Sequence, residues 1–239
     1  TLNQCTLAVN SVSAKTIAAW TFETSQPNNI GPFNPEVGSG SATGFHVGAE
    51  TYTHPTGNGS ANSFTANTWA IGDYFQFSVS TLGQYGLTVA WDQISSSTGP
   101  RDFNFQYSTD GTNFAPFGPN YIVLSNGAPT LWTTTNRLTA TSYTNDLSAL
   151  TTLNNQPTVY FRLVDASTNS VSGGNVTSSG TDRVDNFVVR ATGGGGGLAG
   201  VGTLTVSQST LSGNSASDIG GGLRNFGTLT LANSIVAGN

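Results

Sequence analysis

Hydrophobic and polar residues alternate along four segments in the middle of the chain. Phe75, Phe77 and Val79 alternate with the side chains at 74, 76 and 78, and the same pattern returns at 87–92, 102–108 and 158–163. A period of two places apolar side chains on one face of a strand and polar ones on the other. No segment carries a helical period of useful length. The pattern predicts half-buried strands in a two-layer antiparallel sandwich.

Turn residues between these segments fit the same architecture. Asp110-Gly111 follows one alternating run and precedes the next apolar residues, which is typical of a tight β-hairpin. The block from 14 to 192 offers about 175 residues and many short strands, the usual size of a jelly-roll sandwich. We therefore predict an all-β fold with a jelly-roll domain over residues 14–192.

The C-terminal region repeats itself with a period of 25 residues. Gly195-Gly196-Gly197-Leu198 returns at 220–223, Gly202-Thr203-Leu204-Thr205 returns at 227–230, and the Asn that ends each unit recurs at 214 and 239. A fixed period of this size is the mark of a solenoid whose coils stack on one another. The short Thr-Leu-Thr-Val runs read as strands and the Gly clusters as corners, so residues 193–239 are predicted to be coils of a parallel β-helix.

The first ten residues match the same repeat. Residues 1–10 align without gaps on 205–214, with five of ten positions identical. This predicts that residues 1–13 are a further coil segment and that the sandwich is inserted between coils at a loop tip, where an insertion costs least. The three aligned asparagines, Asn10, Asn214 and Asn239, would then stack as an amide ladder along the solenoid.

The amino-acid composition and charge exclude several classes of protein. Only 8% of the 239 residues are charged and the net charge is −5, which leaves no basic surface for nucleic acid. No apolar run approaches the roughly 18 residues that cross a bilayer. The alternation excludes intrinsic disorder. The single cysteine, Cys5, aligns with Ser209 and Ser234 and is predicted to be a small coil residue rather than half of a disulfide.

The chain contains no methionine, even at its first position. A removed targeting segment or a longer parent protein would both explain this. With the low charge and the Thr, Ser, Asn and Gly content, it favours an exported bacterial protein, located extracellularly or on the cell surface.

Several segments carry a family resemblance, namely 19–23, 72–77, 99–103, 107–111 and 183–187. Together they resemble jelly-roll domains of bacterial secreted and surface-anchored proteins, which are similar in architecture to carbohydrate-binding modules. Separately, 210–216, 220–222 and 227–231 resemble the right-handed β-helix repeats of polymorphic outer-membrane and adhesin-like proteins. Both resemblances imply a cell-surface or extracellular protein, and neither implies catalysis.

The first resemblance also implies a structural calcium ion between the first and last strands of the sandwich. Glu23 and Asp185 occupy the matching places, and carboxylate oxygens are ligands that Ca²⁺ prefers. Glu23 lacks the second nearby acid of the usual pattern. The alternative is that both residues are ordinary edge or turn residues.

Polar side chains of the alternating strands form a candidate ligand face. Planar amides, an arginine fork and aromatic rings suit the hydroxyls and ring faces of sugars. The alternative is the solvated outer side that most antiparallel sheets have. The candidates are Tyr74, Gln76, Asp92, Asn104, Gln106, Tyr160 and Arg162.

Signals for catalysis are weak. His46 and His54 could hold a metal with Glu50, but their spacing of eight residues is not that of a helical ligand pair and loop histidines are more common. No nucleophile elbow or phosphate loop appears. The coils contain too few acids for a paired-carboxylate mechanism. Arg101-Asp102 reads as a loop ion pair. The tryptophans at 20, 69, 91 and 132 read as core residues.

Two functions follow from the sequence. In the first, the protein is a non-enzymatic structural component whose coils stack within a long chain or head to tail between subunits, while the sandwich decorates the shaft. In the second, the sandwich is a carbohydrate-binding or adhesion module that recognises surface glycans, and the β-helix is a spacer. A polysaccharide lyase is the weakest alternative.

Overall fold

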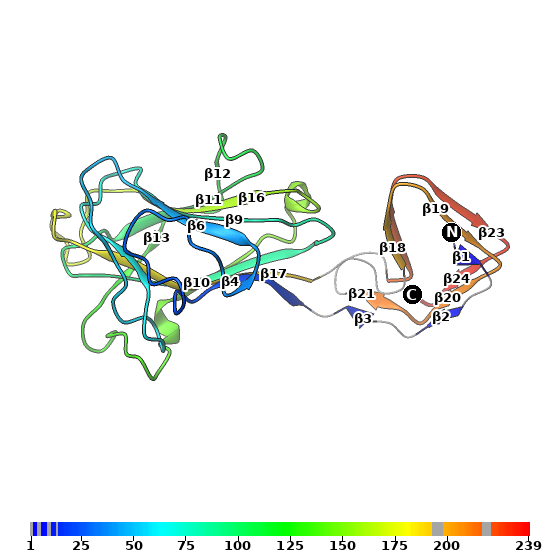
Figure 1. The fold of residues 1–239 in the computed structure, drawn as a ribbon, viewed down its shortest axis with the longest axis horizontal. Coiled ribbons are helices and arrows are strands. Elements are labelled where there is room, and N and C mark those ends of the chain that lie inside the picture. Colours follow the sequence, from blue (N-terminus) through cyan, green and yellow to red (C-terminus); the bar gives the residue numbers. More distant parts are fainter. Residues whose placement is uncertain (1, 4–5, 9–10, 13, 193–197, 217–220) are drawn as a thin grey trace.

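The computed structural model consists almost wholly of strands, which form two groups at opposite ends of the long axis (Figure 1). It describes residues 2–3, 6–8, 11–12, 14–192, 198–216 and 221–239. The larger group lies between residues 15 and 191 and forms two facing sheets. The smaller group joins short strands from both ends of the chain. None of the helices in the described ranges has the length and apolarity that crossing a bilayer needs.

One sheet of the larger group has six strands and is antiparallel throughout. Its strands, across the sheet, are β12 (Ala115–Pro116), β11 (Asp102–Ser108), β16 (Val159–Asp165), β9 (Tyr74–Val79) and β6 (Gly40–Phe45), with β13 (Tyr121–Ile122) also paired to β11. In β9, β11 and β16, core-facing residues alternate with half-exposed ones. The alternation predicted from the sequence is confirmed for these strands.

The facing sheet has eight strands. Its main path is β14 (Leu124–Ser125), β10 (Leu87–Ser95), β17 (Asp182–Ala191), β4 (Lys15–Trp20) and β5 (Val37–Gly38); β15 (Ser142–Asp146) pairs with β10, β8 (Phe64–Ala66) with β17, and β7 (Tyr52–Thr53) with β8. Two short 3₁₀ helices, η1 (Thr139–Thr141) and η2 (Thr151–Leu153), lie in its connections. All its pairs are antiparallel except β10 with β14. The predicted antiparallel sandwich of two sheets is confirmed for this part of the chain, and its jelly-roll topology stays a prediction.

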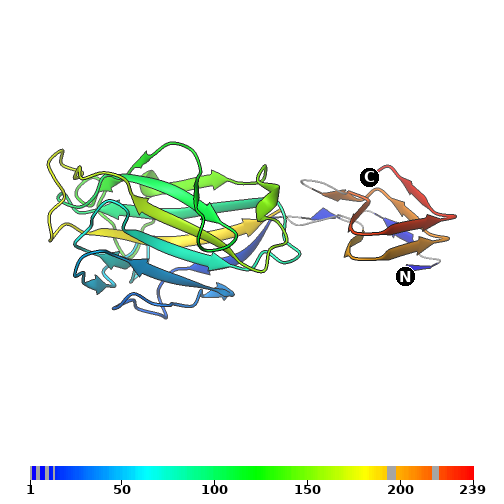
Figure 2. The ribbon, with the colours of Figure 1, turned by 90° about the horizontal axis from the view of Figure 1, so that it is seen from above.

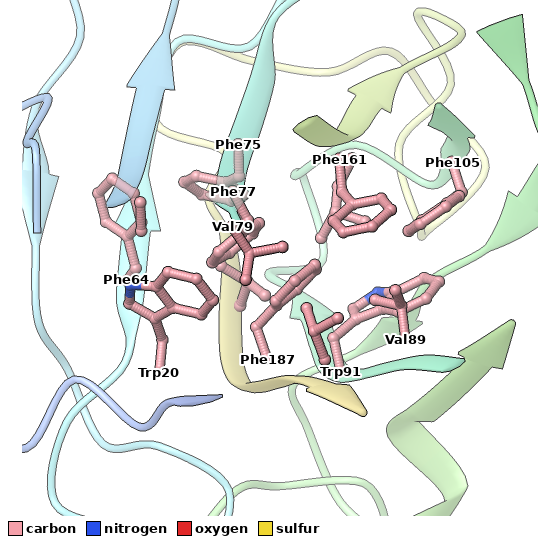
Figure 3. Packing of buried hydrophobic residues seen from close by; sticks show 14 of the residues in the cluster. Trp20, Phe64, Phe75, Phe77, Val79, Val89, Trp91, Phe105, Phe161 and Phe187 are labelled. Carbon is pink, nitrogen blue, oxygen red and sulfur yellow. The ribbon is translucent and has the colours of Figure 1, made fainter. Parts of the chain in front are cut away.

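Aromatic side chains fill the space between the two sheets (Figure 3). Phe77 of β9 and Phe187 of β17 stack across the layers with ring centroids 3.5 Å apart and planes 4° from parallel. Trp20 of β4 packs edge-on against both of these rings. Large buried rings supply most of the apolar area that such a core removes from water. All four tryptophans are at least 94% buried, so their assignment to the core is confirmed.

The predicted hairpin at Asp110-Gly111 is also present. It connects β11 to β12, and Gly111 has a φ of +74°, a conformation that glycine adopts without a steric penalty. The Asp110 carboxylate accepts backbone N–H groups of Thr112 and Asn113, which closes the turn.

The smaller group is made of parallel pairs between repeats. Its strands are β1 (Leu2–Asn3), β2 (Thr6–Ala8), β3 (Ser11–Val12), β18 (Leu198–Val201), β19 (Leu204–Ser207), β20 (Thr210–Ser212), β21 (Ser215–Ala216), β22 (Leu223–Phe226), β23 (Leu229–Ala232) and β24 (Ile235–Ala237). Leu204 pairs with Leu229, and Thr210 pairs with Ile235, each 25 residues on. Leu2 pairs with Val206, as in the sequence alignment.

Close stacking of these strands explains a glycine of the repeat (Figure 2). Gly227 has a φ of +148°, and a Cβ there would lie 2.3 Å from the carbonyl oxygen of Gly202 in the neighbouring layer. Only glycine fits such an approach. Each of the described sheets in this group holds two or three strands. A parallel β-helix therefore stays a prediction, as does its right-handed sense.

A side chain of the smaller group contacts the sandwich. The Arg224 guanidinium of β22 lies 3.6 Å from the ring centroid of Tyr85, which precedes β10 in the sandwich. Both residues are buried. A cation over a ring face is stabilised by the ring quadrupole, more strongly when water is excluded.

Candidate functional site

Six of the seven predicted ligand residues lie on the outward face of the six-stranded sheet. Tyr74 and Gln76 come from β9, Tyr160 and Arg162 from β16, and Asn104 and Gln106 from β11. All six are half-buried, because each alternates with a core residue and is flanked by side chains of neighbouring strands. We refer to these six residues as the outward face.

Arg162 stands at the centre of the outward face. It pairs with Gln76 on one neighbouring strand and with Gln106 on the other. Its guanidinium carbon lies 3.9 Å from the ring centroid of Tyr74 and 3.5 Å from that of Phe114. Nε donates to Oε1 of Gln76 at 2.8 Å. The side chain is therefore held on both sides, with one of its donors already paired.

The aromatic contacts continue beyond Arg162. The ring of Phe45, at the end of β6, stacks on Tyr74 with centroids 5.0 Å apart and planes 17° from parallel. On the other side, Phe114 contacts Tyr160 edge-on with centroids 6.5 Å apart. Ring contacts thus continue from Phe45 on β6 to Tyr160 on β16, with the guanidinium between Tyr74 and Phe114.

Sequence reasoning missed Phe45 and Phe114. Phe45 ends a Gly-rich strand whose period of two is weak, since its residues are Gly40-Ser41-Ala42-Thr43-Gly44. Phe114 lies outside the strands, just after the Asp110-Gly111 turn. The one signal that could have found Phe114 is the hairpin itself, because a tight turn returns the chain to the same sheet.

Partial burial of Arg162 shifts the pKa of its guanidinium. Burial lowers the pKa of the guanidinium, and the neighbouring Tyr74 opposes this shift. Arginine nevertheless stays protonated at neutral pH. Within the described residues, Gln76 is the one hydrogen-bond acceptor of this side chain. The two terminal nitrogens of Arg162 are donors that the rings hold in position, and they can donate hydrogen bonds to a ligand.

Asn104 lies at the β11 side of the outward face. Its Nδ2 donates to Oδ1 of Asn120 at 3.1 Å, and its Oδ1 is buried with no hydrogen-bond partner in the described part of the chain. An unpaired buried acceptor costs about 1–3 kcal/mol. Because this oxygen is buried, it is not accessible to a ligand in the arrangement that the structure shows.

The placement of Asp92 on this face is wrong. Asp92 belongs to β10 in the other sheet and is fully buried. The pairing of β10 with β17 shifts register between Ala90 and Asp92, which ends the strict alternation of that strand. Beyond the shift, residues 91–95 are all buried, whichever face they lie on.

Asp92 instead anchors a buried polar network, to which four other residues donate. Arg137 forms a bidentate pair with it, through Nε to Oδ2 at 2.7 Å and Nη2 to Oδ1 at 2.8 Å. Asn58 and Asn186 donate to Oδ2 through their Nδ2 atoms, at 3.1 and 2.9 Å, and Ser142 donates to Oδ1 at 2.5 Å. The role of Asp92 is structural, because these bonds tie two loops, through Asn58 and Arg137, and two neighbouring strands, through Ser142 and Asn186, to β10.

The two predicted calcium ligands hold one loop between them. Glu23 accepts the N–H groups of Ala61 and Asn62, at 3.2 and 2.7 Å. Asp185 accepts the N–H of Asn58 at 2.8 Å and the hydroxyl of Ser60 at 2.6 Å. Burial raises the pKa of Asp185 to about 7.

These contacts do not fit a calcium site. Both oxygens of each carboxylate receive hydrogen-bond donors, including the Asn186 N–H on Oδ1 of Asp185, whereas Ca²⁺ needs six to eight oxygen ligands facing it. The described residues also hold no group of three or more acids, histidines or cysteines that could bind a metal. The calcium ion stays a prediction that this geometry does not support.

The two histidines have separate partners. Nδ1 of His46 lies 3.3 Å from Oδ2 of Asp73, and both side chains are fully buried, so His46 is not a surface residue. Burial lowers the pKa of His46, while Asp73 opposes the shift. His54 donates to the carbonyl of Pro27 at 3.2 Å. The structure does not bring His46, His54 and Glu50 together as metal ligands.

Two further predictions concern local contacts. Arg101 and Asp102 form the expected ion pair, with Nε 2.9 Å from Oδ1. Asn214 and Asn239 are adjacent, because the backbone N–H and Nδ2 of Asn214 both donate to Oδ1 of Asn239 at 2.9 Å. Asn10 and Cys5 lie outside the described residues.

Comparisons with known proteins found similarity in structure alone. No protein-family model matches the sequence, and no curated protein sequence matches it. The tandem CBM22-1–CBM22-2 domain of Paenibacillus barcinonensis Xyn10C is similar over 78% of this chain and 49% of its own, with a TM-score of 0.47 and 10% identity. The CBM22-2 xylan-binding domain of the same enzyme is similar over 74% of this chain and 99% of its own, with a TM-score of 0.45 and 12% identity.

An adhesin domain is similar to the same degree. The K2 cleaved adhesin domain of Lys-gingipain is matched over 76% of this chain and 98% of its own, with a TM-score of 0.42 and 13% identity. The similar structures thus include carbohydrate-binding modules and an adhesin domain. At these identities the comparison says nothing about the ligand of this chain.

Proposed function

We propose that the sandwich is a non-catalytic carbohydrate-binding module, and that a glycan chain lies across its outward face. This is the second of the two functions that the sequence suggested. The protein would act outside the cell or at the cell surface, where such polymers occur.

The observation that carries this proposal is the clamped guanidinium of Arg162. Fixing a free arginine side chain on binding costs about 0.5–1.5 kcal/mol of conformational entropy. Here Tyr74, Phe114 and Gln76 hold the side chain before any ligand arrives. The terminal nitrogens form a planar fork that can donate to two adjacent hydroxyls of one sugar ring.

The neighbours of Arg162 suit a polyhydroxylated ligand. Gln76 and Gln106 lie beside it in register, and Asn104 follows on the next row of the same face. Amides both donate and accept, as sugar hydroxyls do. Several modest hydrogen bonds along a chain add up to useful affinity without any deep pocket on this face.

The proposal is tested by affinity electrophoresis of the full chain in gels that contain xylan, β-1,4-galactan, mixed-linkage β-glucan or pectin. We expect at least one polymer to retard the protein. Arg162→Gln should weaken that binding about tenfold to a hundredfold, because a hydrogen bond from a charged donor contributes about 1.5–3 kcal/mol. Arg190→Gln is the matched control, since Arg190 is exposed on β17 of the other sheet and the charge change is the same.

Two results would overturn the outward face as the binding site. One is the absence of retardation by every polymer for the wild-type protein. The other is an equal loss of binding in Arg162→Gln and Arg190→Gln, which would reflect net charge rather than a site.

The terminal strands support a second proposal. We propose that residues 1–13 and 193–239 are coils of a short parallel β-helix and that 14–192 is inserted between them, so the coils form a stalk that stacks within a longer chain or on a second copy. The 25-residue register of the parallel pairs favours this. β23 and β24 lie at sheet edges and expose Leu229, Leu231, Ile235 and Val236. Free strand edges with apolar side chains attract further strands.

Sedimentation velocity over a range of protein concentrations tests self-stacking. We expect concentration-dependent association that Leu231→Lys abolishes. Thr230→Lys, on the same strand, is the control. Leu231 pairs with the buried Val206 and lies on the same face of the sheet, whereas Thr230 pairs with Thr205 and lies on the other face. Thr230→Lys should therefore associate as the wild type does. A protein that is monomeric at all concentrations would exclude stacking between copies.

A further inference from the structure

A group of aromatic side chains that the outward face does not use lines a pocket at one edge of the sandwich. The pocket lies where the eight-stranded sheet ends at β15 and the six-stranded sheet ends at β12 and β13, and its volume is about 370 Å³. It is lined by Trp91, Phe105, Phe117, Gly118, Pro119, Asn120, Tyr121, Tyr143, Thr144 and Asn145. We call this the edge pocket.

Ring surfaces form the inner wall of the edge pocket. Trp91 stacks on Phe105 with centroids 5.2 Å apart and on Tyr143 with centroids 5.6 Å apart. Tyr121 contacts both Trp91 and Tyr143, at 5.5 and 4.9 Å. Trp91 and Phe105 are almost fully buried, whereas Tyr121 and Tyr143 are half-buried and reach the opening. The wall is therefore built of aromatic ring surfaces, with Tyr121 turned by 67° from the plane of Trp91.

The rim of the edge pocket is polar but uncharged. Asn120 and Asn145 contribute two side-chain amides, and no lining residue is acidic or basic. Tyr143 and Asn145 pair with Trp91 and Val89, so both project toward the inside of the sandwich. A ligand with a charge would lose its hydration here without gaining a partner. The pocket therefore favours a neutral ligand with an apolar face and a hydroxylated edge.

Buried hydrogen bonds hold the rings in place. Oε1 of Gln93 accepts from Nε1 of Trp91 at 3.1 Å and from the hydroxyl of Tyr121 at 2.7 Å. Nε2 of Gln93 donates to the fully buried Asp182 at 2.9 Å. The Tyr143 hydroxyl donates to the carbonyl of Ile122 at 2.9 Å. Each polar tip of the wall thus has a protein partner, and each ring has a fixed orientation.

Such a network is costly in a sandwich interior, and an apolar core would serve stability as well. Here the network fixes the orientation of the aromatic rings that line the edge pocket. Pre-organisation of this kind lowers the entropic cost of binding.

We propose that the edge pocket binds one terminal pyranose ring of a neutral saccharide. The C–H face of the sugar would lie on the aromatic wall, and its hydroxyls would meet the side-chain amides of Asn120 and Asn145. A volume of about 370 Å³ is at the lower end of the range for small-molecule sites, which suits one or two rings rather than a passing chain. The edge pocket and the outward face lie on opposite sides of β11, because Phe105 and Gln106 point in opposite directions. They meet at Asn120, whose Oδ1 accepts a hydrogen bond from Nδ2 of Asn104.

Tryptophan fluorescence provides the test, because Trp91 lies in the wall. The full-length protein is titrated with methyl β-D-glucopyranoside, methyl β-D-xylopyranoside, methyl β-D-galactopyranoside and cellobiose, and heats of binding are measured in parallel. We expect at least one sugar to produce a saturable change with a millimolar Kd. Asn145→Ala should weaken it about fivefold to tenfold, and Tyr143→Ala should abolish it. Asn136→Ala, an exposed amide outside the pocket, is the control.

Three outcomes would overturn the proposal. The first is no saturable response to any of the four sugars. The second is an equal sugar affinity of the Asn145→Ala and Asn136→Ala variants. This comparison tests the proposal even if Tyr143→Ala fails to fold. The third is saturable binding of p-cresol without binding of a sugar, which would make this a site for aromatic compounds. If the protein binds a short sugar but no polymer retards it, the edge pocket stands as a sugar site and the outward face fails as a polymer site.

Discussion

Replacing Asp92 should destabilise the sandwich more than replacing the arginine that pairs with it. Asp92 is fully buried and accepts hydrogen bonds from four side chains that come from different parts of the chain. The Arg137 side chain is 50% exposed. The two partners of one ion pair therefore differ in what their removal leaves behind.

The magnitudes follow from that difference. Asp92→Asn turns an amide N–H₂ toward donors and leaves at least two of them unpaired inside the protein, which should cost about 3–5 kcal/mol. In Arg137→Gln, water can reach the vacated position and Asp92 keeps three donors. Solvent screening reduces the loss of a half-exposed partner, so we expect about 1–2 kcal/mol.

Guanidinium chloride unfolding followed by tryptophan fluorescence measures both values. All four tryptophans lie in the sandwich, so the signal reports unfolding of that part of the chain. Arg190→Gln, on the exposed end of β17, should change the free energy of unfolding by less than about 0.5 kcal/mol. Equal losses for Asp92→Asn and Arg137→Gln would refute the reasoning, and so would an Asp92→Asn variant as stable as Arg190→Gln.

Two further predictions concern the interior. Burial raises the pKa of Asp165 to about 7, so the folded protein holds this proton more tightly than the unfolded chain does. Its contribution to stability is therefore fully present below pH 4 and is lost as the pH rises to 7. Asp165→Asn should remove this loss. The free energy of unfolding should then fall less between pH 4.5 and pH 7.5 than it does in the wild type. An unchanged fall would contradict this prediction. Phe187→Ala should cost about 3–5 kcal/mol in the same unfolding experiment, because it removes the ring stacked on Phe77, whereas Leu82→Ala, at a 58% exposed position, should stay within about 0.5 kcal/mol. Similar values for these two variants would contradict the assigned core.

Strand positions and the orientation of most side chains could be predicted from local pattern. The polar positions of 74–79 and 158–163 do lie on one face of one sheet, because a period of two is a property of each strand by itself. Asp92 shows where this rule ends. Its strand is regular up to the register shift with β17, and a bulge depends on the partner strand and not on the alternation within β10.

The clamp around Arg162 could be predicted only in part. Tyr74 and Gln76 follow from alternation, but Phe114 reaches the guanidinium through a turn and Phe45 reaches Tyr74 through the pairing of β6 with β9. Both contacts depend on which strands become neighbours. That order is decided by packing across the whole sheet.

The sequence by itself determined the all-β character of the protein, the two-sided strands of the sandwich and the 25-residue register of the terminal strands. These are local or periodic properties that the chain carries at every point. Tertiary structure alone decided that Trp91, Phe105 and Tyr143 line an open edge pocket and that Asp92 gathers Arg137 and two asparagines. Those groups lie tens of residues apart, and they meet because two sheets end at the same edge and loops fold over the same strand.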